Sequence, residues 1–283
     1  MTEPTLIEPA ALAASLDDPQ LLIVDCRFDL ADPRWGAQKH LAGHIPGAVH
    51  ARLETVLSGP VTPQSGRHPL PTPEAFAQTL SGWGVTADTT IVAYDQGHGA
   101  GAARLWWLLR ATEWPRLRVL DGGYAAWLAG GYPVATQLTS RVATHVSPRP
   151  FSGWVTTAAV EQALRGNSAV LVDARAADRY AGQNETIDPI AGHVPGALNH
   201  PFLGNLGPDG RFRSASELRA LWHGLLGERG ASALISMCGS GVTACQNLLS
   251  LEIAGLQGGR LYAGSWSEWI RDPARPVATG AAP

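Results

Sequence analysis

This sequence is poor in charge, in cysteine and in long apolar runs. Only 16% of its 283 residues are charged, the formal net charge is -3, and no basic block stands out, which argues against nucleic acid as a partner. No apolar run approaches the ~18 residues that span a bilayer, so we expect no membrane partner. Three cysteines are too few, and odd in number, for a disulfide scaffold.

The start of the chain, residues 1–4, lacks the basic segment and apolar stretch that mark a secretory signal. We therefore expect a cytoplasmic protein whose cysteines stay reduced. What the sequence does have is apolar material for ordinary cores, because 45% of its residues are hydrophobic. Its length favours two domains of ~150 residues each.

The two halves of the chain repeat each other. The matched segments are 24–27 with 172–175, 42–48 with 191–197, 91–95 with 234–238, and 121–127 with 263–269. A unit this long is a domain rather than a solenoid repeat, so we predict a tandem pair. The predicted boundaries are 1–133 for the N-terminal domain, 134–153 for a polar linker with two prolines, and 154–283 for the C-terminal domain.

Each half alternates strand and helix signals, which predicts an α/β fold. Short apolar runs are typical of buried parallel strands, and they occur at 21–24, 91–94, 169–172 and 234–237. Helix starts are also visible: Thr72 precedes Pro73, and Ser214 is followed three residues later by Glu217, as in a capping box. We expect each domain to be a mostly parallel sheet with helices on both faces.

Cys238 stands at the most informative place in the sequence, a strand-to-helix turn. An uncharged run precedes it, Gly239 and Gly241 flank Ser240 directly after it, and apolar residues at helical spacing follow from Val242. The free N–H groups at a helix start favour an anion, and glycines let the backbone bring further N–H groups toward the same point. This setting predicts a nucleophilic thiolate.

The other two cysteines lack that setting. Cys26 follows an apolar strand, and Cys245 lies inside the predicted helix. We interpret both as small core residues.

These motifs together identify a family. The Val-Asp-x-Arg, Gly-His-(Ile/Val)-Pro-Gly-Ala, Cys-Gly-Ser-Gly-Val-Thr-Ala and Gly-Ser-Trp-Ser-Glu-Trp motifs resemble those of two-domain rhodanese-type sulfurtransferases, over nearly the whole chain. The cysteine loop is similar to that of the 3-mercaptopyruvate branch. Thiosulfate-using members typically have basic residues after the cysteine, where this chain has Gly239 and Ser240. The resemblance implies a catalytic C-terminal domain and a degenerate N-terminal one, which agrees with Asp95 at the position matching Cys238.

The resemblance also implies a double displacement without any cofactor or metal. Cys238 would take the sulfane sulfur of 3-mercaptopyruvate as a persulfide, and cyanide, a small thiol or a thioredoxin-like reductant would then remove it. The loop that cradles this sulfur comprises Gly239, Gly241, Val242 and Thr243.

Proton transfer in that branch is assigned to the loop serine, here Ser240, with a His and an Asp of the N-terminal domain. His44 matches the His of the Gly-His-Ile-Pro-Gly element, and Asp32 is an approximate match for the Asp. Each has a structural alternative. His193 occupies the place of His44 in the second half, and Asp32 precedes Pro33 as a turn residue would.

A 2-oxo acid donor carries a carboxylate, which an arginine is expected to bind. Arg179 matches the family's substrate-binding arginine. The second arginine, which that branch often has shortly before the Gly-His-Ile-Pro-Gly element, is missing from residues 183–189. Arg104, Arg211 and Arg213 remain as alternatives for it.

Three other functions compete with this interpretation. Thiosulfate as the preferred donor is the nearest alternative. A phosphatase of the same fold needs an arginine six residues after the cysteine, where this chain has Ala244. A non-catalytic binding module is disfavoured by the intact cysteine loop.

Overall fold

The computed structural model describes residues 4–281, which form two compact units. Unit 1 comprises residues 4–59, 70–152 and 208–211, and unit 2 comprises residues 60–69, 153–207 and 212–281. Each unit therefore includes a short segment from the opposite half of the sequence.

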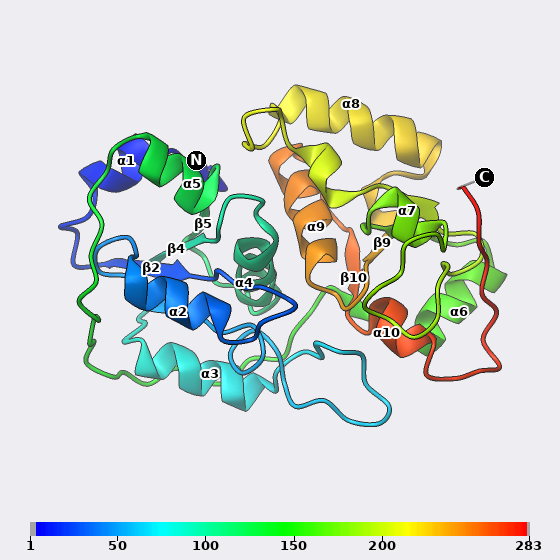
Figure 1. Cartoon of the computed structure of the whole chain (residues 1–283), viewed down its shortest axis with the longest axis horizontal. Coiled ribbons are helices and arrows are strands. Elements are labelled where there is room, and N and C mark those ends of the chain that lie inside the picture. The colour runs from blue at the N-terminus through cyan, green and yellow to red at the C-terminus, as the bar shows by residue number, and fades with distance from the viewer. Residues whose placement is uncertain (1–3, 282–283) are drawn as a thin grey trace. The chain divides into compact units, whose positions relative to one another are not determined.

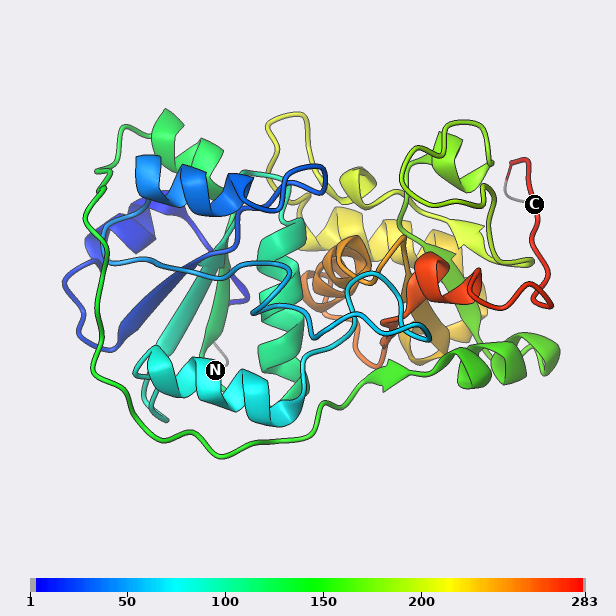
Figure 2. The same cartoon turned by 60° about the horizontal axis from the view of Figure 1, so that its bottom comes forward.

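Unit 1 is built on a five-stranded sheet in the order β1-β5-β4-β2-β3, with every neighbouring pair parallel. Its strands are β1 (Leu6–Ile7), β2 (Leu21–Asp25), β3 (Val49–His50), β4 (Thr90–Tyr94) and β5 (Leu117–Leu120). Its helices are α1 (Pro9–Ala14), α2 (Trp35–Ala42), α3 (Pro73–Gly82), α4 (Ala100–Ala111) and α5 (Gly123–Ala129). Figure 2 shows α1, α2 and α5 over one face of this sheet and α3 and α4 over the other.

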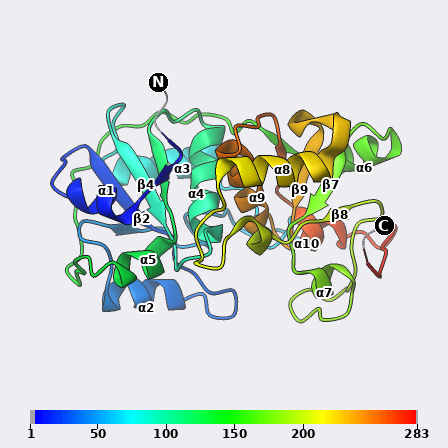
Figure 3. The same cartoon turned by 90° about the horizontal axis from the view of Figure 1, so that it is seen from above.

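Unit 2 repeats this plan with the order β6-β10-β9-β7-β8, again parallel throughout. Its strands are β6 (Trp154–Val155), β7 (Val170–Asp173), β8 (Leu198–Asn199), β9 (Leu234–Met237) and β10 (Arg260–Tyr262). Its α-helices are α6 (Thr157–Arg165), α7 (Ala177–Tyr180), α8 (Ala215–Leu226), α9 (Thr243–Ile253) and α10 (Ser265–Trp269), with 3-10 turns at Phe202–Asn205, Gly227–Arg229 and Ala231–Ala233. Helices α8 and α9 cover one face, while α6, α7 and α10 lie on the other (Figures 1 and 3). The expected α/β fold with tandem parallel sheets is confirmed.

Local sequence chemistry accounts for the helix starts. The Thr72 hydroxyl accepts a hydrogen bond from the backbone N–H of Ala75, with Pro73 at the first helical position. At α8 the Ser214 hydroxyl accepts from the N–H of Glu217, whose carboxylate accepts in return from the N–H of Ser214. The capping box predicted from the sequence is therefore present.

The strands occupy the predicted runs, but β2 and β7 continue to an aspartate. Asp25 pairs with Tyr94 across the ladder, and Asp173 pairs with Met237. Each acid remains in a buried strand because an arginine two residues later folds back onto its carboxylate: Arg27 on Asp25, and Arg175 on Asp173. A buried charge is tolerated only with such a partner.

Aromatic side chains fill one face of each sheet. In unit 2, Trp266 and Trp269 of α10 pack with Tyr262 of β10 in one cluster, and in unit 1 Trp127 of α5 packs with Tyr94 of β4. Burial of such large apolar side chains is the main stabilising contribution to each unit. Within residues 4–281, every helix is too short or too polar to cross a bilayer.

Candidate active site

The sulfur of Cys238 lies in the turn between β9 and α9 and accepts a hydrogen bond from a backbone amide. The N–H of Gly241 is 3.1 Å from Sγ, and the cysteine is 2% exposed. The Cys238 N–H donates to the Ser265 hydroxyl at 3.1 Å, and the Cys238 carbonyl accepts from the N–H of Trp266 at 2.9 Å. The start of α10 thus holds the backbone of the cysteine from both sides. The hydrogen bond from an amide to a sulfur atom becomes stronger when the sulfur is negatively charged.

Only glycine fits at position 241. Its φ is +78°, and a Cβ there would lie 2.4 Å from the carbonyl oxygen of Ala263. The Gly241 carbonyl accepts from the thiol of Cys245 at 3.2 Å. Cys245 is fully buried, as expected of a core residue, and it contacts the same glycine whose N–H meets Cys238. Val242 is buried as the cap of α9, and Thr243 begins that helix.

Ser240 is hydrogen-bonded to a histidine that the sequence did not single out. Its hydroxyl lies 2.7 Å from Nδ1 of His68, and both residues are buried. His68 comes from the loop 60–69, which belongs to unit 2 although it precedes α3 in the sequence. Figure 2 shows this light-blue loop beside α10. An imidazole hydrogen-bonded to a serine hydroxyl is the arrangement of a proton relay.

Arg179 lies beside the loop in an ion-pair network. Its guanidinium binds both carboxylate oxygens of Glu185, with Nη2 at 2.8 Å and 2.9 Å, and reaches Asp188 at 3.2 Å. Burial alone raises the pKa of Glu185, but hydrogen bonds from Arg179 and from the amides of Asp188 and Ile187 lower it below its usual value. Glu185 is therefore a fixed anion that holds Arg179 in place.

Arg175 lies in a buried ion pair that recurs in both units. It binds Asp173 at 2.7 Å and the Gly192 carbonyl at 2.8 Å, as its repeat partner Arg27 binds Asp25 and Gly43. Burial works to lower the pKa of Arg175, but Asp173 and Glu185, with a further contribution from Cys238, raise it above its usual value.

A second arginine, Arg67, approaches the cysteine loop. It forms an ion pair with Asp188, and a Cβ built on Gly239 would lie 3.1 Å from its Nη2. The same Cβ would lie 3.7 Å from Nη2 of Arg179. Two guanidinium groups therefore flank the residue that follows Cys238, although neither of the two residues directly after the cysteine is basic.

His44 and Asp32 have other partners in unit 1. Nδ1 of His44 lies 2.7 Å from the His40 carbonyl, and Nε2 lies 3.2 Å from that of Gln137. His193 makes the corresponding contact with the Tyr180 carbonyl at 2.9 Å. Asp32 accepts from the N–H of Arg34 in the turn before α2. The histidine that the structure shows hydrogen-bonded to Ser240 is His68, which belongs to the same unit.

The three arginines left as alternatives are engaged elsewhere. Arg104 is buried in unit 1 and donates to the Leu57 carbonyl. Arg211 pairs with Glu8, and Arg213 donates to the Gly204 carbonyl. The two arginines that lie near Gly239 within unit 2 are Arg67 and Arg179.

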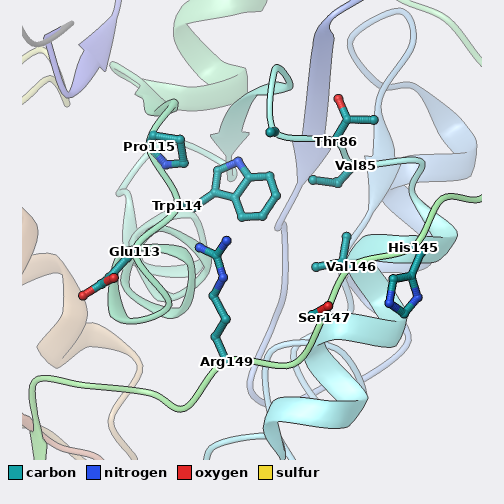
Figure 4. Close-up of a pocket in the computed structure, with 10 residues that line it drawn as sticks. Val85, Thr86, Glu113, Trp114, Pro115, His145, Val146, Ser147 and Arg149 are labelled. Carbon is teal, nitrogen blue, oxygen red and sulfur yellow. The ribbon is translucent and has the colours of Figure 1, made fainter.

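A separate cavity of about 430 Å³ is lined entirely by unit 1 residues, so none of the cysteine loop contributes to it. Figure 4 shows Arg149 of the linker pointing toward the indole of Trp114, whose ring centre lies 5.8 Å from the guanidinium carbon. Within residues 4–281, no three His, Cys, Asp or Glu side chains are grouped as a metal ion requires.

Comparison with known proteins places the chain in a family. The profile of the rhodanese-like domain matches residues 8–130 and 156–272, so this protein belongs to the rhodanese family and contains the domain twice. It is 47% identical over 286 residues to the probable 3-mercaptopyruvate sulfurtransferase of Pseudomonas aeruginosa, covering 99% of this chain and 100% of the relative. The thiosulfate sulfurtransferase of Rattus norvegicus is 31% identical over 265 residues, covering 89% and 86%.

Among solved structures, the 3-mercaptopyruvate sulfurtransferase from Leishmania major superimposes with a TM-score of 0.84 at 31% identity, covering 95% of this chain and 76% of that one. The resemblance deduced from the sequence motifs is confirmed.

Proposed function

We propose that this protein is a sulfurtransferase that carries sulfur from 3-mercaptopyruvate to a thiol or cyanide through a persulfide on Cys238. The observation that supports the proposal best is the pairing of two features in one loop. The Gly241 amide donates to Sγ, and two residues after the cysteine Ser240 is hydrogen-bonded to His68. The amide stabilises a negatively charged sulfur, and the serine–histidine pair can transfer a proton.

In the first half-reaction the Cys238 thiolate attacks the sulfur of the donor. The S–S bond forms as the C–S bond of the donor breaks, and the electron pair of the C–S bond passes to carbon as an enolate. The proton of the donor thiol ends on that carbon, so the products are pyruvate and an anionic persulfide. Atoms and electrons balance without an oxidant, and the Gly241 amide offers a donor to the anion.

Ser240 and His68 are assigned to that proton. The serine hydroxyl donates toward the oxygen on which enolate charge develops, and His68 accepts or returns a proton through the serine. We assign His44 the structural role that it shares with His193, because both histidines hold backbone carbonyls.

In the second half-reaction a nucleophile removes the outer sulfur and restores the thiolate. A small thiol, a thioredoxin-like protein or cyanide has the chemistry required, and a reducing compartment such as the cytoplasm keeps Cys238 available for it.

Thiosulfate is the second candidate donor, and one observation favours it. Arg67 and Arg179 place positive charge at Gly239, where a dianionic donor needs it. Their pairing with Asp188 and Glu185 offsets that charge, which favours the singly charged 3-mercaptopyruvate.

The test is a comparison of the two donors on the purified protein. We expect kcat/KM for 3-mercaptopyruvate to exceed that for thiosulfate, and mass spectrometry to find one added sulfur atom on the peptide that contains Cys238. Cys238→Ser should lose the added sulfur and at least about 10³-fold in rate, as removal of a covalent nucleophile does. A preference for thiosulfate would select the second candidate, and an unchanged peptide mass with both donors would reject a sulfurtransferase.

A further inference from the structure

A single buried carboxylate lies between the two arginines at the cysteine loop. One oxygen of Asp188 binds Nη1 of Arg67, and the other lies 3.2 Å from Nη2 of Arg179. The Asp188 side chain is 2% exposed, whereas those of Arg67 and Arg179 are 29% and 18% exposed. The carboxylate is thus bound by two guanidinium groups in the way that a carboxylate ligand is bound by an arginine pair.

This arrangement lies next to the nucleophile. A Cβ on Gly239 would lie 3.1 Å from Arg67, 3.6 Å from Asp188 and 3.7 Å from Arg179. All three charged groups therefore converge on the one residue that follows Cys238. The space that a side chain at position 239 would fill is bounded by these charges.

Arg67 is held there by the loop itself. Its N–H donates to the Ser267 hydroxyl at 2.9 Å, and the Ser267 N–H donates to the Gly239 carbonyl at 2.9 Å. A Cβ on Gly66 would lie 2.4 Å from the Gly264 carbonyl oxygen, so the chain before Arg67 packs directly on the start of α10. Arg67 is consequently positioned by the start of α10, which also holds the backbone of the cysteine through Ser265 and Trp266.

Arg67 retains unused hydrogen-bonding capacity. Its Nε is buried and has no hydrogen-bond partner. A buried, unsatisfied donor is uncommon, and either an ordered water or an anionic ligand can satisfy it.

The two carboxylates of the network differ in how firmly they are held. Glu185 binds Arg179 and Arg175 and accepts from the backbone N–H groups of Ile187 and Asp188. The side-chain contacts of Asp188 are the two arginines at the loop. Asp188 is therefore the carboxylate that a ligand anion can displace.

We propose that Arg67 and Arg179 form an anion seat at Gly239, which Asp188 occupies in the free protein and yields to the anionic end of the sulfur donor. Asp188 then sets donor selectivity. With Asp188 and Glu185 present, two positive charges meet two negative ones, so the seat is neutral and disfavours a dianion. This inference rests on the proposed function, because it assigns the donor site of that reaction.

The seat makes opposite predictions for its two members. Arg67→Gln should raise KM for 3-mercaptopyruvate about 10- to 100-fold, the range expected for a lost hydrogen bond to charge, with little change in kcat. Asp188→Asn should lower KM for both donors, because the seat gains one positive charge. The increase in kcat/KM should be about 10-fold larger for thiosulfate than for 3-mercaptopyruvate, because thiosulfate carries two negative charges. Arg67→Lys should fall between wild type and Arg67→Gln.

A purely structural ion pair predicts something else. Both substitutions would then change KM in the same direction, together with the midpoint of thermal unfolding, and that outcome would overturn the proposal. Arg165→Gln is the matched control, because it breaks an exposed ion pair with Glu161 on α6 of the same unit and should leave both kinetics and unfolding unchanged.

Binding of unreactive anions separates this inference from the proposed function. Calorimetry with pyruvate and sulfate should show tighter binding to Asp188→Asn than to wild type, and weaker binding to Arg67→Gln. If turnover occurs but binding and KM do not respond in these opposite directions, the anion seat is refuted and the sulfurtransferase stands. If neither donor is turned over, the proposed function fails, and the calorimetry alone decides whether the seat exists.

Discussion

The loop after β4 in unit 1 and the loop after β9 in unit 2 occupy the same place in two copies of one fold, and in each loop backbone N–H donates to a side-chain acceptor. In unit 1 the acceptor is a carboxylate. One oxygen of Asp95 accepts from the N–H groups of Gly97 at 2.9 Å and Gly99 at 3.0 Å, and the other accepts from Gly101 at 2.9 Å. In unit 2 the acceptor is the Cys238 sulfur, which receives the Gly241 amide.

The surroundings of the two loops are the same. The carbonyl of Asp95 accepts from the N–H of Tyr124, as the carbonyl of Cys238 accepts from the N–H of Trp266. The carbonyl of the following residue also accepts a hydrogen bond in both units. That of Gln96 accepts from the N–H of Ala125, and that of Gly239 accepts from the N–H of Ser267. The scaffold is therefore retained in both units, and what differs is the anion: a carboxylate that fills its own cradle in unit 1, and a sulfur in unit 2.

The largest effect should come from removing the built-in anion of unit 1. Asp95→Ala leaves several buried N–H groups without an acceptor, so we expect the free energy of unfolding to fall by about 3–5 kcal/mol. Cys238→Ala, which removes the acceptor of the matching loop, should lower it by only about 1 kcal/mol. Urea unfolding of both variants measures the difference.

Asp95→Asn is the control for that pair, because it keeps one acceptor oxygen and most of the shape. It should fall between wild type and Asp95→Ala. Equal losses of stability in Asp95→Ala and Cys238→Ala would contradict the view that unit 1 depends on its anion and unit 2 does not.

A second, smaller effect should be a loss of folding stability at low pH. Burial raises the pKa of Asp25, but hydrogen bonds from His40 and Arg27 overcome it and hold the pKa at about 2, below the ordinary 3.8. Since the folded-state value is the lower one, the stabilisation is complete above pH 3.8 and is lost as the pH falls toward 2. A difference of this size corresponds to about 2 kcal/mol.

Urea unfolding of the wild type and of Asp25→Asn between pH 5 and pH 2 tests this. The variant should be less stable at pH 5, and its stability should change less with pH, because it has lost the titrating group. Parallel pH profiles for the two proteins would assign the acid response to other carboxylates, with Glu185 of unit 2, whose pKa is also lowered, as the first to examine.

The sequence predicted the fold because the information was local and duplicated. The apolar runs of β4 and β9, the caps at Thr72 and Ser214, and the loop around Cys238 each have a short-range physical cause. Repetition then made each signal visible twice. Four of the strands were predicted from the sequence, and two of these, β2 and β7, extend past their predicted C-terminal ends. Asp25 and Asp173 stay in the ladder through ion pairs that residue-by-residue propensity does not include.

The sequence did not predict the contacts of Arg67 and His68, because the information for them is neither local nor repeated. Arg67 and His68 lie in a loop without periodicity and outside the repeated motifs, and they contact residues more than 100 positions away. Nothing in the repeat indicates that residues 60–69 join unit 2. His44 was the more visible histidine because it belongs to a repeated motif, and both copies of that motif hold backbone.

The smallest effect compares the two helices that start with the clearest sequence signals. Thr72 at α3 of unit 1 makes a single capping hydrogen bond, while Ser214 at α8 of unit 2 takes part in a reciprocal box with Glu217. Each alanine substitution should lower the free energy of unfolding by about 1 kcal/mol. The Ser214 change should cost a few tenths more, because it removes the acceptor of the Glu217 N–H and also disturbs the hydrogen bond from the Ser214 N–H to Glu217.

Glycine substitution is the sharper test of that comparison. Glycine is itself a good N-cap, so Thr72→Gly and Ser214→Gly should each lower stability by only a few tenths of a kcal/mol, measured by the same urea titration. The reason is that a glycine leaves the helix-end amides open to water, whereas alanine shields them without accepting a hydrogen bond. If Ser214→Gly is instead as damaging as Ser214→Ala, the contribution at α8 comes from the Glu217 half of the box, and Glu217→Gln should then retain most of the stability because its amide oxygen still accepts from the Ser214 N–H.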